Sequence, residues 1–97
     1  MEYDICKKIP NLLRKYRKAN GYKQKDVARI LGIKSSSKIS RWENGECIPN
    51  LVNAFKISIL FRVMVDSLFI DLLRQLRGEM KKRENEYMKK KQSTSHH

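Results

Sequence analysis

The chain has 97 residues, with 22 lysines and arginines against 10 aspartates and glutamates, and a formal net charge of +12. This length predicts one small domain, whose apolar residues suffice for a helical core but not also for a deep catalytic cleft. The charge favours a nucleic-acid partner, although an anionic membrane surface or a merely soluble basic protein would fit it too. Cys6 and Cys47 are not spaced as metal ligands, so we expect both to be unpaired thiols in a reducing cytoplasm.

Neither a signal peptide nor a membrane span is expected. Glu2 and Asp4 stand where a cationic leader region would begin. The most apolar stretch, residues 51–73, contains Lys56 and Arg62 among other charges. Each charge at the centre of a bilayer would cost about 2.5–3.5 kcal/mol, so this stretch predicts helical core and a cytoplasmic protein without a membrane partner.

The first predicted helix covers Ile9 to Asn20. Pro10 suits its first turn, where a missing N–H is harmless, and Gly21 ends it. Leu13 falls on its inner face. Residues 1–8 are expected to form a short N-terminal extension.

Residues 24–45 predict two short helices joined by a tight turn. The first begins near Gln24 and stops at Gly32, although Lys23 is a weak residue for its cap. Its apolar residues recur at helical spacing. They are Val27, Ala28 and Leu31.

The second of these helices has one apolar face and one polar, acid-free face. Its cap is expected at Ser35 or Ser36, and Asn44–Gly45 is a good left-handed end. A period of 3.6 residues places Ile39, Trp42 and Glu43 on the inner face and Ser37, Lys38 and Arg41 on the outer face. Short hydroxyls and long cations without an acid suit a groove of phosphates and base edges.

A fourth helix is expected after Asn50, which is a sound N-cap. Its end cannot be read, because residues 51–77 contain neither proline nor glycine, and residues 63–65 could form a joint or continue the helix. Further apolar residues follow at spacings of three and four beyond what a small core needs, which predicts a helical seam and a homodimer. They are Leu72, Leu73, Leu76 and Met80.

The C-terminal part of the chain is basic and interrupted by acids. Residues 81–91 alternate lysine and arginine with Glu84 and Glu86, which is typical of a solvated helix face. Residues 93–97 are expected to be a disordered tail, in which His96–His97 resembles the remnant of a purification tag.

Several pieces follow one another in a characteristic order and spacing, namely residues 13–21, 24–28, 31–33, 39–45 and Pro49. In this arrangement residues 9–69 resemble the lambda-repressor/Cro family of helix-turn-helix proteins, also called the XRE family. The resemblance implies an all-α fold, a compact five-helix lambda-repressor-like domain that continues into an extended basic C-terminal helix. The expected divisions are 1–8, 9–69, 70–92 for the C-terminal helix, and 93–97.

The resemblance also assigns roles to individual residues. The third helix, about residues 35–44, would lie in the major groove of double-stranded DNA. The family's base-reading positions fall on Ser36, Ser37 and Arg41, with Lys38 and Ser40 beside them; phosphate contacts are expected from Gln24, Lys34 and Asn44. Arg17 and Glu43 are implied to form a structural ion pair.

The chain departs from the family pattern at several positions. It has one residue more than shorter members between Gly32 and Ile39, and Lys23 replaces a capping hydroxyl. Arg62 stands where a glycine commonly closes the fourth helix, and Met64 stands where a serine or proline usually opens the fifth.

Two classes of function are compatible with the sequence. One is a sequence-specific DNA-binding transcriptional regulator, a repressor, and the alternative is a basic adaptor or antitoxin-type protein whose main role is to bind a protein partner. The acid-free face of the third helix favours the first. No catalytic residue, metal ligand or cofactor is expected, because no nucleophile, base or ligand set lies at a useful spacing.

Overall fold

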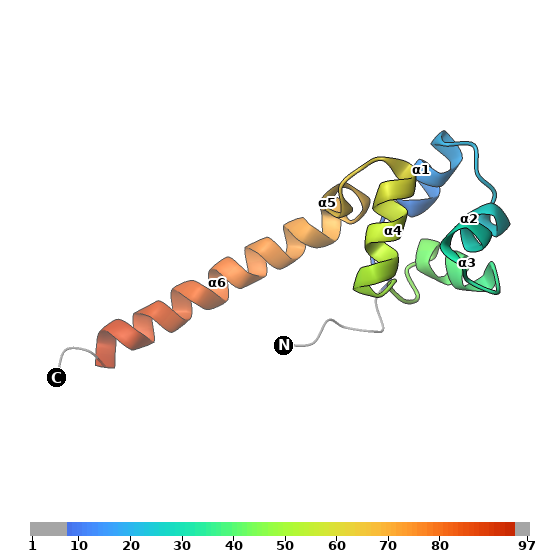
Figure 1. Ribbon diagram of the computed structural model, residues 1–97. Helices are drawn as coiled ribbons and strands as arrows, with labels where there is room; N and C mark the ends of the chain where they lie inside the picture. Colours follow the sequence, from blue (N-terminus) through green and yellow to red (C-terminus); the bar gives the residue numbers. More distant parts are fainter. Residues whose placement is uncertain (1–7, 95–97) are drawn as a thin grey trace.

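The computed structural model describes residues 8–94, and within this range the chain forms six helices and no strand (Figure 1). The helices are α1 (Leu13–Ala19), α2 (Gln24–Leu31), α3 (Ser37–Glu43), α4 (Leu51–Phe61), α5 (Val65–Leu68) and α6 (Ile70–Thr94). The first five form a compact bundle, and α6 leaves it on the side away from α2 and α3, so that the molecule measures 61 × 27 × 20 Å. The all-α fold expected from the sequence is confirmed.

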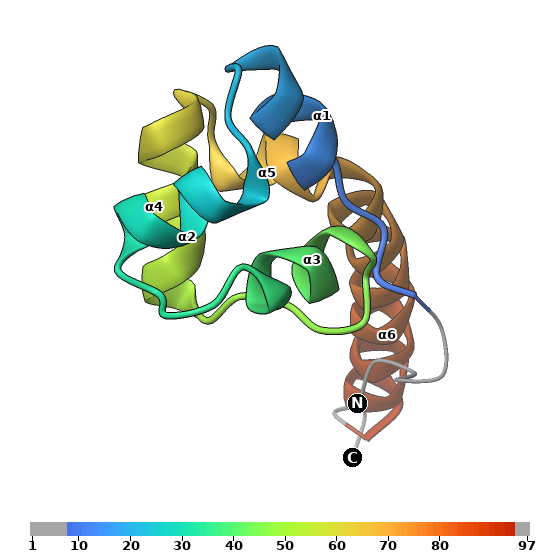
Figure 2. The same cartoon turned by 90° about the vertical axis from the view of Figure 1, so that its right-hand side faces the viewer.

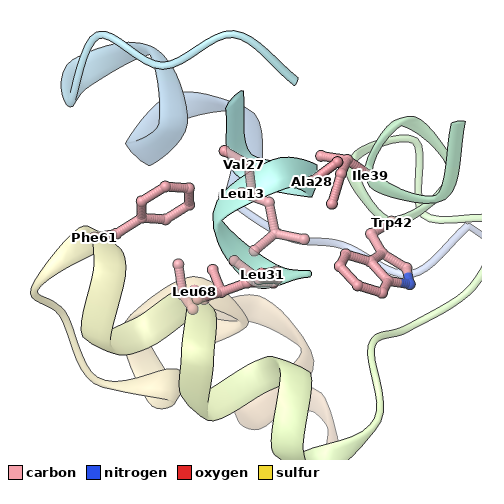
Figure 3. Close-up of a cluster of buried hydrophobic side chains, with 9 residues drawn as sticks. Leu13, Val27, Ala28, Leu31, Ile39, Trp42, Phe61 and Leu68 are labelled. Carbon is pink, nitrogen blue, oxygen red and sulfur yellow. The ribbon is translucent and has the colours of Figure 1, made fainter. Parts of the chain in front are cut away.

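The core of the bundle is a cluster of apolar side chains from all five of its helices (Figure 3). Ile39 and Trp42 of α3 are 3% and 2% exposed, as their helical spacing predicted. Leu68 of the short α5 is fully buried. The rest of the cluster is Leu13, Val27, Ala28, Leu31, Ile57 and Phe61.

The first helix is shorter than predicted, because α1 begins at Leu13 and not at Ile9. Asn11 explains the late start: its Oδ1 accepts a hydrogen bond from the Leu13 N–H at 3.1 Å and so supports a turn before the helix. The Leu12 N–H donates to the Leu68 carbonyl at 2.8 Å instead of facing solvent. The expectation that Pro10 occupies the first turn was therefore wrong.

Two other helix starts agree with the sequence. Asn50 caps α4, because its Oδ1 accepts from the Asn53 N–H at 2.8 Å. The start of α2 has Lys23 at the cap position, and Asp26 compensates in part by accepting from the Lys23 N–H at 2.8 Å.

The fourth and fifth helices are separate, and Arg62 forms the joint between them. Its backbone lies in the left-handed region at φ 57° and ψ 42°, and it is the only described non-glycine residue with positive φ. The Val63 N–H then donates to the Ser58 carbonyl at 3.1 Å, which closes the end of α4. An arginine thus adopts the conformation for which glycine is the favoured residue.

Arg62→Gly should stabilise the protein by about 0.5–1 kcal/mol. A left-handed residue with a Cβ is strained by roughly 1–2 kcal/mol, and glycine removes this strain from the folded state. Glycine also raises the conformational entropy of the unfolded chain, which offsets about half of the gain. Denaturant melts of the parent and the variant measure the difference. Arg62→Ala is the matched control, since it removes the same exposed side chain and keeps the strain. Equal melts for Gly and Ala would show that the backbone of Arg62 is not strained.

The C-terminal helix starts at Ile70 and continues through Thr94, past the boundary expected at residue 92. Residues 1–7 and 95–97 lie outside the described residues, and with them Cys6, most of the expected N-terminal extension and the terminal histidines. In the part of the chain that is described, no helix combines the length and the apolarity needed to cross a membrane.

Candidate nucleic-acid interface

The second and third helices are joined by a tight turn whose start is set by Gly32. Gly32 has φ 80°, and the next N–H, that of Ile33, donates back to the Ala28 carbonyl at 2.8 Å. Ser36 occupies the cap position of α3, but the hydroxyl that accepts from the main chain is that of Ser35, which binds the Ser37 N–H at 3.2 Å. Figure 2, which views the bundle from the side of α2 and α3, shows α3 at its surface.

The outer face of α3 is exposed as the sequence predicted. Ser37, Lys38 and Arg41 are exposed, whereas Ser36 and Ser40 are half-buried. Because Ile39 and Trp42 anchor the opposite face in the core, α3 cannot rotate without exposing them. The orientation of the outer face is therefore fixed by packing.

A hollow of about 560 Å³ lies between this face and the turn before it. Its lining includes three cations, Lys34, Lys38 and Arg41, together with Ser35 and Ser37, and no acidic residue of the described range 8–94. Lys34, the expected phosphate contact in the turn, thus lies beside the expected base contacts. Half-buried Cys47 also lines the hollow as a free thiol, which the sequence alone did not place there.

Glu43, the last residue of α3, is held by side chains from α1 and α2. Its carboxylate is 1% exposed and accepts from Arg17, whose Nε lies 2.5 Å from Oε2 and whose Nη2 lies 3.1 Å from Oε1. Arg17 also donates to the Tyr22 carbonyl at 2.9 Å. The expected partners Arg17 and Glu43 therefore form a bidentate pair inside the bundle.

Two further donors bind Glu43 Oε1. Gln24 Nε2 lies at 3.0 Å and Arg14 Nε at 3.3 Å. Burial by itself raises the pKa of Glu43, but the hydrogen bonds from Arg17 and Gln24 and the charge of Arg17 outweigh it, so the pKa lies below its ordinary value of 4.5. The carboxylate is consequently charged at neutral pH.

The two expected phosphate contacts at the ends of the motif have partners within the protein. The amide nitrogen of half-buried Gln24 is bound to Glu43. Exposed Asn44 accepts from Arg14 Nη2 at 3.0 Å and donates to Ser40 Oγ at 3.5 Å. Arg14, which the sequence analysis did not single out, therefore joins the network at the end of α3.

The end of α3 is also fixed by the segment before α1. Asn11 Nδ2 donates to the Trp42 carbonyl at 3.0 Å, and the Ile9 N–H donates to the Gly45 carbonyl at 2.9 Å. Gly45 has φ 76°, and a Cβ added there would lie only 2.6 Å from the Ile9 carbonyl oxygen. Residues 9–11 thus hold the C-terminal end of α3 through contacts that no local sequence pattern predicts.

Comparison with known proteins agrees with this architecture. A family model described as helix-turn-helix matches residues 13–68, which spans α1 to α5. A protein of Methanocaldococcus jannaschii named as an uncharacterized HTH-type transcriptional regulator is 38% identical over 62 residues, which are 64% of this chain and 92% of that protein. No solved structure matches the chain. The chain therefore belongs to the XRE family of helix-turn-helix proteins, the family of lambda repressor and Cro.

Proposed function

We propose that the protein is a sequence-specific DNA-binding transcriptional regulator that reads the major groove with α3. The observation that carries this proposal is the cationic hollow beside an exposed, acid-free helix face. Phosphates and base edges are acceptor-rich, and hydroxyls and long cations are the side chains that bind them. The name of the archaeal relative, a transcriptional regulator, supports the same class of function.

Within this proposal the polar side chains of α2, α3 and the turn between them divide into two roles. Arg41 reaches a base edge, with guanine as its favoured bidentate partner, and Ser36, Ser37, Lys38 and Ser40 lie beside it. Phosphate contacts come from the two ends of the motif and from the turn inside it, and they fix the register of α3 in the groove. They are Gln24, Lys34 and Asn44.

We further propose that the regulator acts as a repressor and as a homodimer. Occupying an operator is enough to block transcription, so repression requires no surface beyond the DNA-binding face and the dimer contact. Two copies of α3 would read half-sites about 34 Å apart on a roughly palindromic site. The exposed apolar residues of α6 and α4, considered below, support the dimer.

Arg41→Ala should weaken binding to the preferred site by about 1–3 kcal/mol and relax the preference at one base pair. Lys38→Ala should weaken binding to all sequences alike and reduce the salt slope by about one. The preferred site is first selected from random DNA, and fluorescence anisotropy then measures affinity at several salt concentrations. Lys15→Ala is the matched control, because it removes an exposed cation from α1 that is outside the lining of the hollow. Unchanged affinity and site preference in Arg41→Ala would show that α3 does not present this face to the bases.

A further inference from the structure

Helix α4 is apolar around most of its circumference. Ala54, Ile57 and Phe61 are buried in the core, but other large apolar residues of this helix face solvent. An apolar helix without a polar side is normally covered on all sides. The exposed residues are Leu51 at 69%, Val52 at 62%, Phe55 at 53% and Ile59 at 74%.

An apolar groove of about 330 Å³ connects the start of α4 to α5 and the first turns of α6. Its lining includes Leu51 on one side and Leu72, Leu73 and Leu76 on the other, and among the described residues Asp66 is the only charged one that lines it. Figure 1 shows α4 and α6 diverging from α5 as the two arms of a V, so the groove opens away from the bundle. A helix is the shape of ligand that fits such a groove.

The same chain offers a helix whose apolar stripe is left exposed by the rest of the described residues. Helix α6 has 25 residues, about 37 Å of helix, and most of it projects beyond the bundle. Past the groove its apolar residues continue at positions that share a face with Leu76, namely Met80, 55% exposed, and Tyr87, 64% exposed. Lys81, Lys82 and Arg83 lie among them.

We propose that α6 of a second copy lies in the groove between α4 and α6, and that the contact is reciprocal. Both unpartnered surfaces belong to one chain, and a two-fold dimer buries each of them twice with the same pairing. Charge favours this occupant, because residues 81–91 carry six lysines and arginines against Glu84 and Glu86, and this net basic segment meets a groove whose charged lining residue, among those described, is Asp66. The inference rests on the dimer proposed above and names its surface, and it does not depend on DNA reading.

Sedimentation equilibrium at tens of micromolar tests the arrangement on the full chain. Ile48→Glu/Leu51→Glu alters the α4 side of the groove, and Met80→Glu/Tyr87→Glu alters the far half of α6. All four side chains are more than half exposed, so each variant should keep the parent's helical circular dichroism and its melt. Each should dimerise at least tenfold more weakly than the parent.

A mixture of the two variants provides the sharpest readout. One variant keeps an intact α6 and the other keeps an intact α4 face. Together they should therefore form a heterodimer with one unaltered contact, more tightly than either variant forms a homodimer. Val52→Glu/Ile59→Glu is the matched control, since it adds the same two charges at exposed apolar positions of α4 that do not line the groove, and it should stay dimeric.

Three results would overturn the inference. A dimer that survives Ile48→Glu/Leu51→Glu would place the contact between the two α6 helices alone, and a mixture without heterodimer would refute reciprocal docking. A parent that sediments as a monomer would refute the dimer, and the exposed face of α4 would then be a contact for a different protein. Binding of each variant to a single half-site is measured in parallel, so that failure of the dimer and failure of DNA recognition are seen separately.

Discussion

Glu43→Ala should lower the free energy of unfolding by about 3–5 kcal/mol. The substitution leaves the guanidinium of Arg17 inside the bundle, where the side chain is 10% exposed, without the carboxylate that neutralises it. An uncompensated buried charge is among the most destabilising single changes that a protein can suffer. For a domain of this size such a loss is a large share of the total stability. Denaturant melts at neutral pH measure it.

Arg14→Ala is the control for the same carboxylate. The Arg14 side chain is 52% exposed, so its pair with Glu43 is screened by solvent and should contribute less than about 1 kcal/mol. If Glu43→Ala lost no more stability than Arg14→Ala, the buried Arg17–Glu43 pair would contribute no more to stability than the exposed Arg14–Glu43 pair.

The pH dependence of stability gives an independent readout, with Glu43→Gln as the uncharged reference. Because the pKa of Glu43 is lowered in the folded state, its contribution is fully present above the ordinary value of 4.5 and is lost as the pH falls through the folded-state pKa. The parent should therefore lose stability relative to Glu43→Gln as the solution is acidified below that value. A stability difference that stays constant with pH would contradict the lowered pKa.

Gly45→Ala should destabilise the protein by about 2–5 kcal/mol, the second large effect. A left-handed residue with a side chain is strained by roughly 1–2 kcal/mol, and a forced shift of neighbouring backbone adds about 1–3 kcal/mol. At Gly45 a Cβ would lie 2.6 Å from the carbonyl oxygen of Ile9 and 2.8 Å from its nitrogen, so the segment before α1 must move. The loss is measured by denaturant melts.

Gly32→Ala separates the two contributions to this effect. Gly32 has nearly the same φ, 80° against 76°, but a Cβ there would meet nothing within 4 Å. Its replacement should therefore show the conformational strain alone. Equal losses at the two glycines would mean that the contact between residues 9 and 45 adds nothing to stability.

Local patterns predicted much of the fold because they report on single elements. The spacing of Ile39 and Trp42 placed α3 against the core, and Asn50 marked the start of α4 correctly. The start of α1 escaped prediction because Asn11 and Leu12 bond to distant segments, namely to Trp42 and to Leu68. The break after α4 was left open by the local patterns, since no local rule favours a left-handed arginine.

The candidate interface divides in the same way. The exposed face of α3 follows from helical periodicity, so Lys38 and Arg41 could be selected from the sequence. Arg14, Asn11 and Cys47 could not, because their relation to α3 is created by contacts between separate segments. The resemblance to a family supplied the Arg17–Glu43 pair, which charge pattern alone would not have selected.

Three donors share one carboxylate oxygen of Glu43, and this affects how Gln24 would bind a DNA phosphate. Glu43 Oε1 accepts from Arg14, Arg17 and Gln24 at once, and Arg17 alone also serves Oε2. The bond from Gln24 is therefore redundant: if its amide turns outward, both carboxylate oxygens still have a cationic donor. In the proposed DNA complex, Gln24 could therefore donate to a phosphate oxygen instead of to Glu43 without leaving the buried carboxylate unpaired. The Arg17–Glu43 pair that holds the end of α3 would stay in place.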